Sequence, residues 1–315
     1  MKKKQSYNFG FRGWMLMIYQ FIAFFTFTVF TNFPMNILAE DFYGGATLVA
    51  NVYTYATIAT IIIQLIASKF IGKIKNMKNI SLILGAVTLA VAVFLMVYPA
   101  PMGADPLWLA MFAIETVASI LYATFTIGVI AGQWFPRRKG TFMGIATIAF
   151  PVTNALIGIF ATSVFEMDFE AGAPKLILWL TSGGMAGSNT ILTSFLPFFI
   201  VALIGWLIGL IFVKDYPEQC GAYRDNDKSI TPEVAKAMME QEIEAKKTTV
   251  WTTGHILGTR DFWFITIPAG FLLMFAVGAM TQTSPIFAAV GLSDSYDMIM
   301  LGIAAAGIVG SYVLG

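Results

Sequence analysis

The sequence predicts an all-α membrane protein built as a bundle of spanning helices. Of its 315 residues, 57% are hydrophobic and only 12% are charged, about half of the ~25% that is usual in soluble domains. The apolar residues form continuous runs rather than the alternating pattern of membrane β-strands. These observations exclude a water-soluble enzyme, a disordered chain and a disulfide scaffold.

Eight apolar segments approach or exceed the ~20 residues that a spanning helix needs. They run roughly over 14–36, 46–70, 80–100, 107–133, 141–163, 192–213, 262–287 and 297–315. The first is expected to be an uncleaved helix, because it is longer than a signal peptide and further spans follow it. Pro151 is expected to kink or loosen the fifth.

The basic residues divide unequally between the two sides of these spans. Of the 19 Lys and Arg residues, 18 fall on the side of the N-terminus, and only Lys175 falls on the other. Basic residues concentrate on the cytoplasmic side of membrane proteins. We therefore expect a multi-pass protein of the plasma (cytoplasmic) membrane of a prokaryote, with its N-terminus inside.

The polar segment 214–260 separates the first six spans from the last two. Thr231 can cap a helix, Pro232 suits its first position, and Glu233 suits its positive end. This pattern predicts a cytoplasmic helix to about Lys247. The predicted organisation is a six-span lobe (1–213), a cytoplasmic linker (214–260) and the start of a second lobe (261–315).

The first and seventh spans share features at both ends. Arg12–Trp14 opens the first and Arg260–Trp263 opens the seventh, while Asn32–Pro34 and Thr283–Pro285 close them. Repeats of parallel orientation are typical of transporters made of two halves. The alternative is a chance similarity between two aromatic-rich helices.

This plan of six spans, a charged linker and a second lobe resembles the major facilitator superfamily. The segment Gly132–Gly140, followed by Met143 and Gly144, is similar to the junction of the fourth and fifth spans in the oxalate/formate antiporter branch. The segment Tyr216–Tyr223 is also similar to that branch. The resemblance implies a major facilitator-like helical bundle, with a six-span N-lobe and the first two spans of a C-lobe.

The chain departs from the superfamily in two places. The segment Ser68–Lys78 keeps the basic residues and the glycine of the superfamily's pattern between spans 2 and 3 but lacks its aspartate, which puts a cytoplasmic latch in doubt. The chain also ends within or just after its eighth span, whereas the family has twelve. We interpret it as the N-terminal portion of a longer transporter and expect residues 1–315 alone not to transport.

Glu115 is the one ionisable residue well inside a predicted span. Charge at that depth is costly, so such residues usually face a cavity or a partner. Glu115 could be a protonatable coupling site or a cation contact, or a protonated side chain bonded to a neighbouring helix. Ser119, Tyr122 and Thr126 follow at helical spacing and are predicted to share its face.

Further candidates come from the resemblance, which places spans 1, 4 and 7 around a central cavity. Gln20, Asn32 and Gln282 are candidate substrate or coupling residues, although polar side chains also serve as packing contacts between membrane helices. The candidate residues of a cytoplasmic gate, whose alternative role is to anchor the topology, are Lys73, Lys78, Arg137, Arg138 and Lys139.

The leading functional prediction is a secondary active transporter that moves a small solute by alternating access. The resemblance implies an organic anion such as a carboxylate, moved by antiport or proton-coupled symport. The alternative is a non-transporting sensor or scaffold on the same fold. No nucleophile–base pair or phosphate loop indicates an enzyme, and a single cysteine and a single histidine make a metal site implausible. We expect a monomer in the lipid bilayer, without cofactor or nucleic acid.

Overall fold

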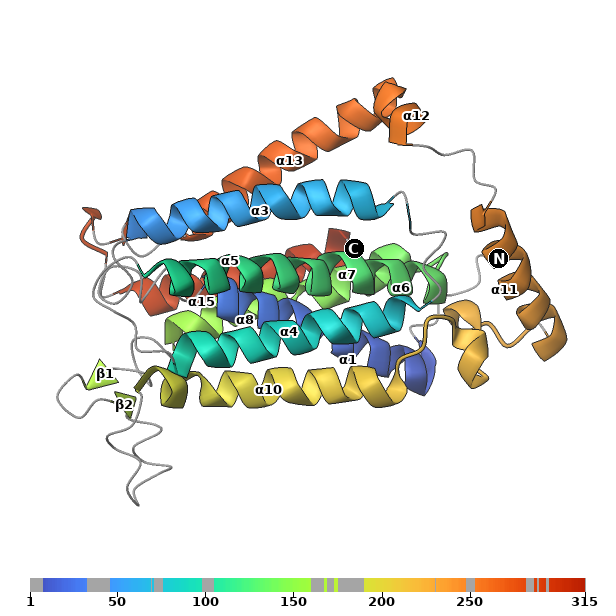
Figure 1. Ribbon diagram of the computed structural model, residues 1–315, viewed down its shortest axis with the longest axis horizontal. Coiled ribbons are helices and arrows are strands. Elements are labelled where there is room, and N and C mark those ends of the chain that lie inside the picture. Colours follow the sequence, from blue (N-terminus) through green and yellow to red (C-terminus); the bar gives the residue numbers. More distant parts are fainter. Residues whose placement is uncertain are drawn as a thin grey trace, which may run out of the picture.

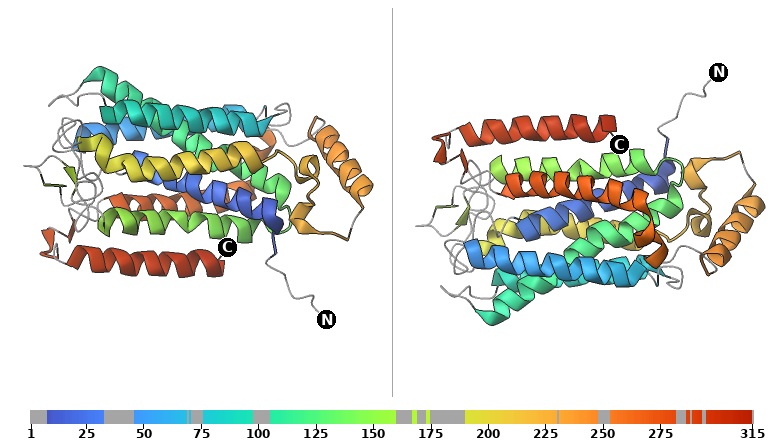
Figure 2. Two further views of the ribbon diagram at one scale, coloured as in Figure 1. Left: turned by 90° about the horizontal axis from the view of Figure 1, so that it is seen from below. Right: turned by 90° about the horizontal axis from the view of Figure 1, so that it is seen from above.

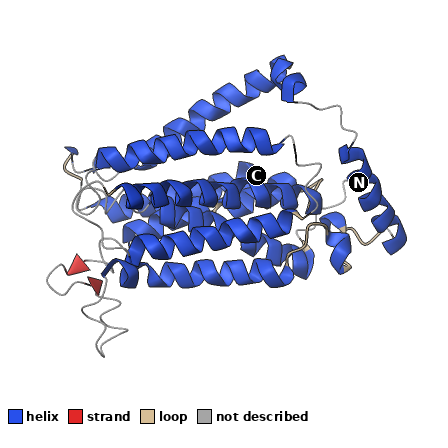
Figure 3. Cartoon of the chain, in the orientation of Figure 1, coloured by secondary structure: helices blue, strands red, loops and turns tan. Residues whose placement is uncertain are grey.

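The computed structural model describes residues 8–32, 46–68, 70, 76–97, 105–159, 167–168, 173–174, 190–229, 231–247, 253–281, 286–287, 289–292 and 295–314. Almost all of these residues are helical (Figure 3). Within the described ranges, strand structure is limited to β1 (Met167–Asp168) and β2 (Ala173–Pro174), which pair antiparallel. The predicted all-α fold is therefore observed.

The long helices run back and forth along one axis (Figure 1). In chain order they are α1 (Gly10–Phe27) with the π-helical η1 (Thr28–Asn32), α3 (Ala46–Ser68), α4 (Met77–Val97), α5 (Pro106–Ile120) with the π-helical η4 (Leu121–Thr126) and α6 (Ile127–Trp134), α7 (Lys139–Thr147) with α8 (Ala149–Ile159), α10 (Thr190–Phe212), α13 (Arg260–Thr281) and α15 (Tyr296–Leu314). These passes coincide with the eight predicted spans to within a few residues at most described ends.

Several of these helices have the length and composition of membrane spans. In the described part of the chain, four stretches are long and apolar enough to cross a bilayer: Gly10–Thr31, Thr47–Ser68, Met77–Leu95 and Pro106–Trp134. Two shorter apolar helices, Phe198–Phe212 and Met298–Gly310, accompany them. The predicted membrane character is therefore observed in α1, α3, α4 and α5–α6, with shorter apolar stretches in α10 and α15.

The segment after α10 gathers at one end of the bundle, opposite β1 and β2 (Figures 1 and 2). It contains the 3₁₀ turns η6 (Pro217–Cys220) and η7 (Arg224–Asn226), then α11 (Pro232–Lys247) and α12 (Thr253–Gly258). The predicted start of α11 is observed, and Val234 N–H points to Thr231 Oγ1 at 3.5 Å.

α1 lies in the interior and packs along α10. Their close approach depends on Gly205 and Gly209, which are spaced as in the Gly-x-x-x-Gly motif of membrane helix pairs. A Cβ at Gly205 would lie 2.2 Å from Ile22 Cγ2, and one at Gly209 would lie 2.4 Å from Tyr19 Cε2. Only glycine fits at these two crossings.

The predicted fifth span is two helices rather than one. α7 ends at Thr147 and α8 begins at Ala149, with Ile148 N–H bonded to Ile145 O in a tighter turn. Pro151 has no N–H to donate to the carbonyl of Thr147, so the ladder is interrupted one turn before the proline. The expected loosening is thus observed as a break. α15 packs against α8 beside Pro151.

Candidate functional site

Glu115 lies on α5, whose start is fixed by its own sequence. Asp105 caps the helix by accepting the N–H of Leu107 at 2.7 Å, and Pro106 occupies the first position. Glu115 is completely buried. Its position agrees with the prediction of a carboxyl group well inside the fourth span.

A polar cluster surrounds this carboxyl group. Thr31 Oγ1 donates to Glu115 Oε2 at 3.4 Å, and Thr31 and Ser119 join their hydroxyls at 3.1 Å. Glu115 Oε1 is buried and has no hydrogen-bond partner in the part of the chain that the structure describes. We call Glu115, Thr31 and Ser119 the carboxylate cluster. It connects span 1 to span 4, because Thr31 belongs to η1 and the other two residues belong to α5.

Both helices that form the carboxylate cluster contain π-helical turns next to it. Thr31 lies within η1, and η4 begins two residues after Ser119. π-Helical turns are rare and are frequent at functional sites. Their wider turn also changes the angular spacing on which the predicted four-residue stripe depends.

The structure brings Ser119 to Glu115 but places Tyr122 and Thr126 elsewhere. The Tyr122 ring lies edge-on to Tyr19, with ring centroids 5.8 Å apart, and Tyr19 bonds Ser81 at 2.9 Å. Thr126 donates to the carbonyl of Tyr122 in its own helix at 3.1 Å. Both residues are buried against neighbouring side chains, as expected of packing contacts.

The other predicted candidates lie apart from the carboxylate cluster or outside the described residues. Gln20 is buried in α1 and donates to Met143 Sδ of α7 at 3.5 Å, while its Oε1 has no hydrogen-bond partner within the described ranges. The backbone of Asn32 ends η1, but its side chain lies outside the described part of the chain, as does all of Gln282.

α3 brings polar side chains of the second span toward the carboxylate cluster. Tyr53 is close enough to Glu115 for the two groups to interact electrostatically. Thr57, one turn further along α3, interacts with the Tyr53 hydroxyl. A polar side chain of span 2 is therefore within electrostatic range of the carboxylate cluster.

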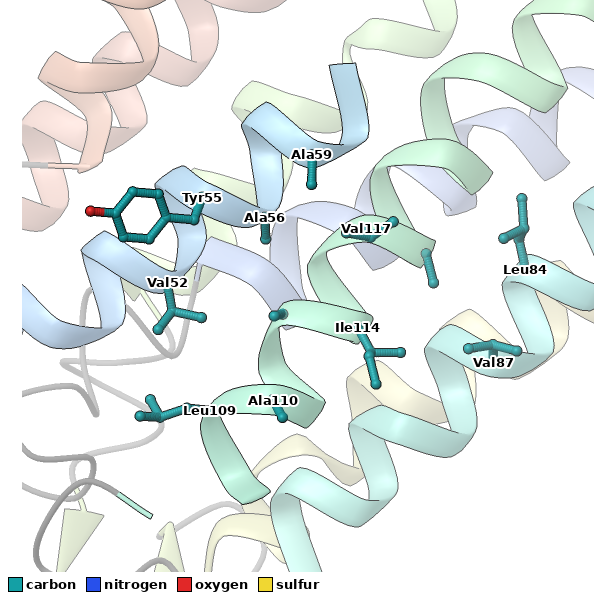
Figure 4. A pocket seen from close by; sticks show the side chains of 12 residues that line it. Val52, Tyr55, Ala56, Ala59, Leu84, Val87, Leu109, Ala110, Ile114 and Val117 are labelled. Carbon is teal, nitrogen blue, oxygen red and sulfur yellow. The ribbon is translucent and has the colours of Figure 1, made fainter. Parts of the chain in front are cut away.

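A pocket of about 700 Å³ lies between α3, α4 and α5 and is separate from the carboxylate cluster (Figure 4). Its lining side chains are apolar apart from the hydroxyl of Tyr55, which is 71% exposed. Ile114 faces this pocket although its neighbour Glu115 is buried in the interior. The pocket is a lateral hollow lined by Val52, Tyr55, Ala56, Ala59, Leu84, Val87, Leu109, Ala110, Ala113, Ile114, Val117 and Ala118.

At the linker end, two aspartates that the sequence analysis did not single out bind the starts of other helices. Asp225 accepts the backbone N–H groups of Arg137 and Arg138 at 3.2 and 3.1 Å, in the turn before α7. Asp215 accepts the N–H of Lys78 at 2.6 Å, in the first turn of α4. Burial raises the pKa of Asp215, although this N–H acts to lower it.

Three of the predicted gate residues, Lys78, Arg137 and Arg138, donate their backbone N–H groups to these two aspartates. Lys78 Nζ donates to Leu210 O at the end of α10, where a cation is favoured by the negative end of the helix. Arg137 forms an exposed ion pair with Asp227 at 3.6 Å. The α7 helix starts at Lys139, and Lys73 lies outside the described residues.

Arg224 anchors the linker helix to the same end of the bundle. Its guanidinium pairs with Glu218 of η6 at 2.7 Å and with Glu242 of α11. Burial acts to lower the pKa of Arg224, but the two carboxylates together raise it above its usual value.

The sequence was then compared with known proteins. The model of the Major Facilitator Superfamily matches residues 15–315. The chain belongs to the major facilitator superfamily. Searches of curated proteins and of solved structures returned no match.

Membership in the superfamily establishes several of the sequence predictions. This facilitator is a secondary transporter and not an enzyme, and it is a multi-pass membrane protein that binds a small-molecule substrate. Its fold is the major facilitator helical bundle. Among the described residues, no group of three or more His, Cys, Asp and Glu side chains forms a metal site.

Proposed function

We propose that this facilitator moves a small organic anion, such as a carboxylate, by alternating access, as an antiporter or a proton-coupled symporter. Support for the substrate class comes from the two segments that resemble the oxalate/formate antiporter branch. These segments lie together at the linker end, where Cys220 and Ala222 pack against the apolar cluster that contains Phe135. We further propose a monomer in the plasma membrane, with the N-terminus and the linker in the cytoplasm and with lobe boundaries at 213 and 261.

The observation that carries the coupling mechanism is the burial of Glu115 between spans 1 and 4. No ion pair to Glu115 occurs among the described residues, and its hydrogen bonds come from neutral hydroxyls. An isolated charge is costly in the membrane interior, so the carboxyl group needs a proton or a cation while the site is closed. When Glu115 gains or loses that proton or cation, its hydrogen bond with Thr31 of η1 would change.

The binding of an anion requires positive or hydrogen-bonding groups beyond the carboxylate cluster. The described helices of the eight passes carry Lys and Arg only in their end turns and not along their interiors. Helix N-termini can bind carboxylates through their free N–H groups, and they do so in transporters with interrupted helices. We propose that such groups, together with side chains of the second lobe, bind the substrate.

Transport by the full-length protein in proteoliposomes tests the proposal. Counterflow of radiolabelled oxalate, formate and larger dicarboxylates should be saturable, and its absence for every small organic anion would favour the sensor or scaffold. Glu115→Gln keeps the shape of the side chain but cannot carry the charge. It should abolish accumulation driven by a pH gradient and leave exchange at equal concentrations intact.

The matched control is Thr88→Val in α4. Thr88 is also buried, and its hydroxyl donates to the Leu84 carbonyl of its own helix at 2.9 Å. It should retain both exchange and pH-driven accumulation. A Glu115→Gln variant with unchanged pH dependence would remove Glu115 from the coupling mechanism.

A further inference from the structure

We propose that the carboxylate cluster is a binding site for one small monovalent cation, Na⁺. Three side-chain oxygens from two spans surround the site: a carboxylate oxygen of Glu115 and the hydroxyls of Thr31 and Ser119. The second carboxylate oxygen, Glu115 Oε1, is fully buried and has no hydrogen-bond partner among the described residues. This oxygen is available as a further ligand.

The spacing of the oxygens also accommodates a cation. Ser119 Oγ donates its proton to Thr116 O at 3.1 Å, which leaves its lone pairs available to a cation. Bonds between a hydroxyl and another oxygen are usually about 2.7–2.8 Å long, whereas those from Thr31 to Ser119 and to Glu115 Oε2 are 3.1 and 3.4 Å. Neighbouring oxygens around an octahedral ion with bonds of about 2.3–2.4 Å lie about 3.3 Å apart. Na⁺ is nearly the same size as Ca²⁺, which has such bonds, while the bonds of Mg²⁺ would bring the oxygens to about 2.9 Å.

The charge of the cluster selects a monovalent ion. Glu115 supplies one negative charge, and Thr31 and Ser119 are neutral. A monovalent cation neutralises this site, but a divalent cation would leave an uncompensated charge in the membrane interior, at high cost. Na⁺ meets both the size and the charge requirement.

Other ionisable groups do not compete for Glu115 within the described residues. Of the helices that pack against α5, α3 brings Tyr53 into electrostatic range, and its phenol is neutral at physiological pH. The cations of α1 and α4, Arg12 and Lys78, bind backbone carbonyls at the end of α10. A cation from solution or a proton must therefore supply the counter-charge.

The inference deepens the proposed function by naming an ion for the Glu115 site. Na⁺ and a proton would occupy the same carboxyl group in turn, so they compete. Binding of Na⁺ would also draw the hydroxyl of span 1 and the carboxylate of span 4 onto one ion, and it would stabilise the packing of η1 against α5.

Equilibrium binding to the full-length protein in detergent, without any substrate, tests the site. NaCl is titrated at constant ionic strength against choline chloride, and the melting temperature is followed by tryptophan fluorescence. Wild type should show a saturable rise, roughly 3–5 °C at ten times the Kd. At lower pH the apparent Kd for Na⁺ should increase, because protons compete for Glu115.

Three variants and one control locate the ion. Glu115→Gln should abolish the Na⁺-dependent rise, and Thr31→Val and Ser119→Ala should each raise the Kd at least about tenfold, since each removes one of few ligands. Thr88→Val should keep the wild-type Kd. A wild type without a rise over choline, or a Glu115→Gln or Ser119→Ala variant with the wild-type Kd, would overturn the site.

The binding assay separates this inference from the proposed function. If the wild type shows counterflow of organic anions but no Na⁺ binding, the cation site alone is refuted. Intact Na⁺ binding with no counterflow of any organic anion refutes the proposed substrate class and leaves the site in place.

Discussion

Replacement of Asp225 should destabilise the six-span lobe through a contact remote in sequence. Asp225 is 6% exposed, and its carboxylate accepts the N–H groups of Arg137 and Arg138 in the turn before α7. Asp225→Ala would leave two partly buried donors without a partner and remove a negative charge from the positive end of α7.

The expected loss can be worked from these contacts. Each orphaned donor costs about 1–3 kcal/mol when buried, and these two are only partly buried, so the sum is about 2–3 kcal/mol. Asp225 also has a left-handed backbone, with φ of 51°, which costs alanine up to about 1 kcal/mol more than aspartate or asparagine. A total of about 2–4 kcal/mol corresponds to a fall in melting temperature of roughly 4–16 °C for a lobe of this size.

Thermal unfolding of the purified protein in detergent measures this loss, with Asp225→Asn as the matched control. Asparagine tolerates the left-handed conformation and keeps an acceptor oxygen, so it should stay close to wild type. Limited trypsin digestion gives a second measure, because Asp225→Ala should release the linker and speed cleavage at Lys228. Equal melting temperatures and equal cleavage rates for the Ala and Asn variants would refute the reasoning.

Three further predictions follow from the packing, ionisation and topology. Gly209→Ala should lower the melting temperature by overpacking the α1–α10 crossing, at a cost of about 1–3 kcal/mol, whereas Gly128→Ala, where nothing lies within 4 Å, should not. Because burial raises the pKa of Asp215, the folded chain holds this proton to higher pH than the unfolded chain. Stability should therefore fall as pH rises from about 4 through the folded pKa, and Asp215→Asn should flatten that part of the curve of melting temperature against pH. In a cysteine-free background, an impermeant thiol reagent should label a cysteine at Asp168 from outside the cell and miss one at Lys228; the reverse would refute the predicted orientation.

The positions of the helices could be predicted because their signals are local. Continuous apolar runs give the long helices, and the Asp105–Pro106 and Thr231–Pro232 pairs mark the starts of α5 and α11. Pro151 predicted a weakened fifth span. The sequence does not show that the break falls at Ile148, because the helix can adjust to the missing hydrogen bond at several nearby positions.

The candidate site was only partly predictable. Glu115 could be identified from the sequence because it is a lone carboxyl group within an apolar run. Its partner Thr31 lies 84 residues away, and no local pattern pairs the two. The stripe through Tyr122 and Thr126 assumed 3.6 residues per turn, whereas η4 is π-helical. The sequence carried no signal that predicts this change.

The aspartates of the linker were missed for a related reason. Asp215 and Asp225 lie in a polar segment with many charges, and their backbone partners are 137 and 87–88 residues away. Backbone N–H groups have no side-chain signature in the sequence. Only the three-dimensional arrangement shows which carboxylate reaches which helix.

The two aspartates also determine an order of events while the chain is being synthesised. Asp215 is translated 137 residues after Lys78, about 7–27 s later at ordinary rates of elongation. During that interval the start of α4 has been synthesised without its acceptor, and the turn before α7 likewise lacks Asp225. Both contacts are therefore completed only after the ribosome has passed the end of α10, and a ribosome that stalls there would hold helices that lack both aspartate contacts.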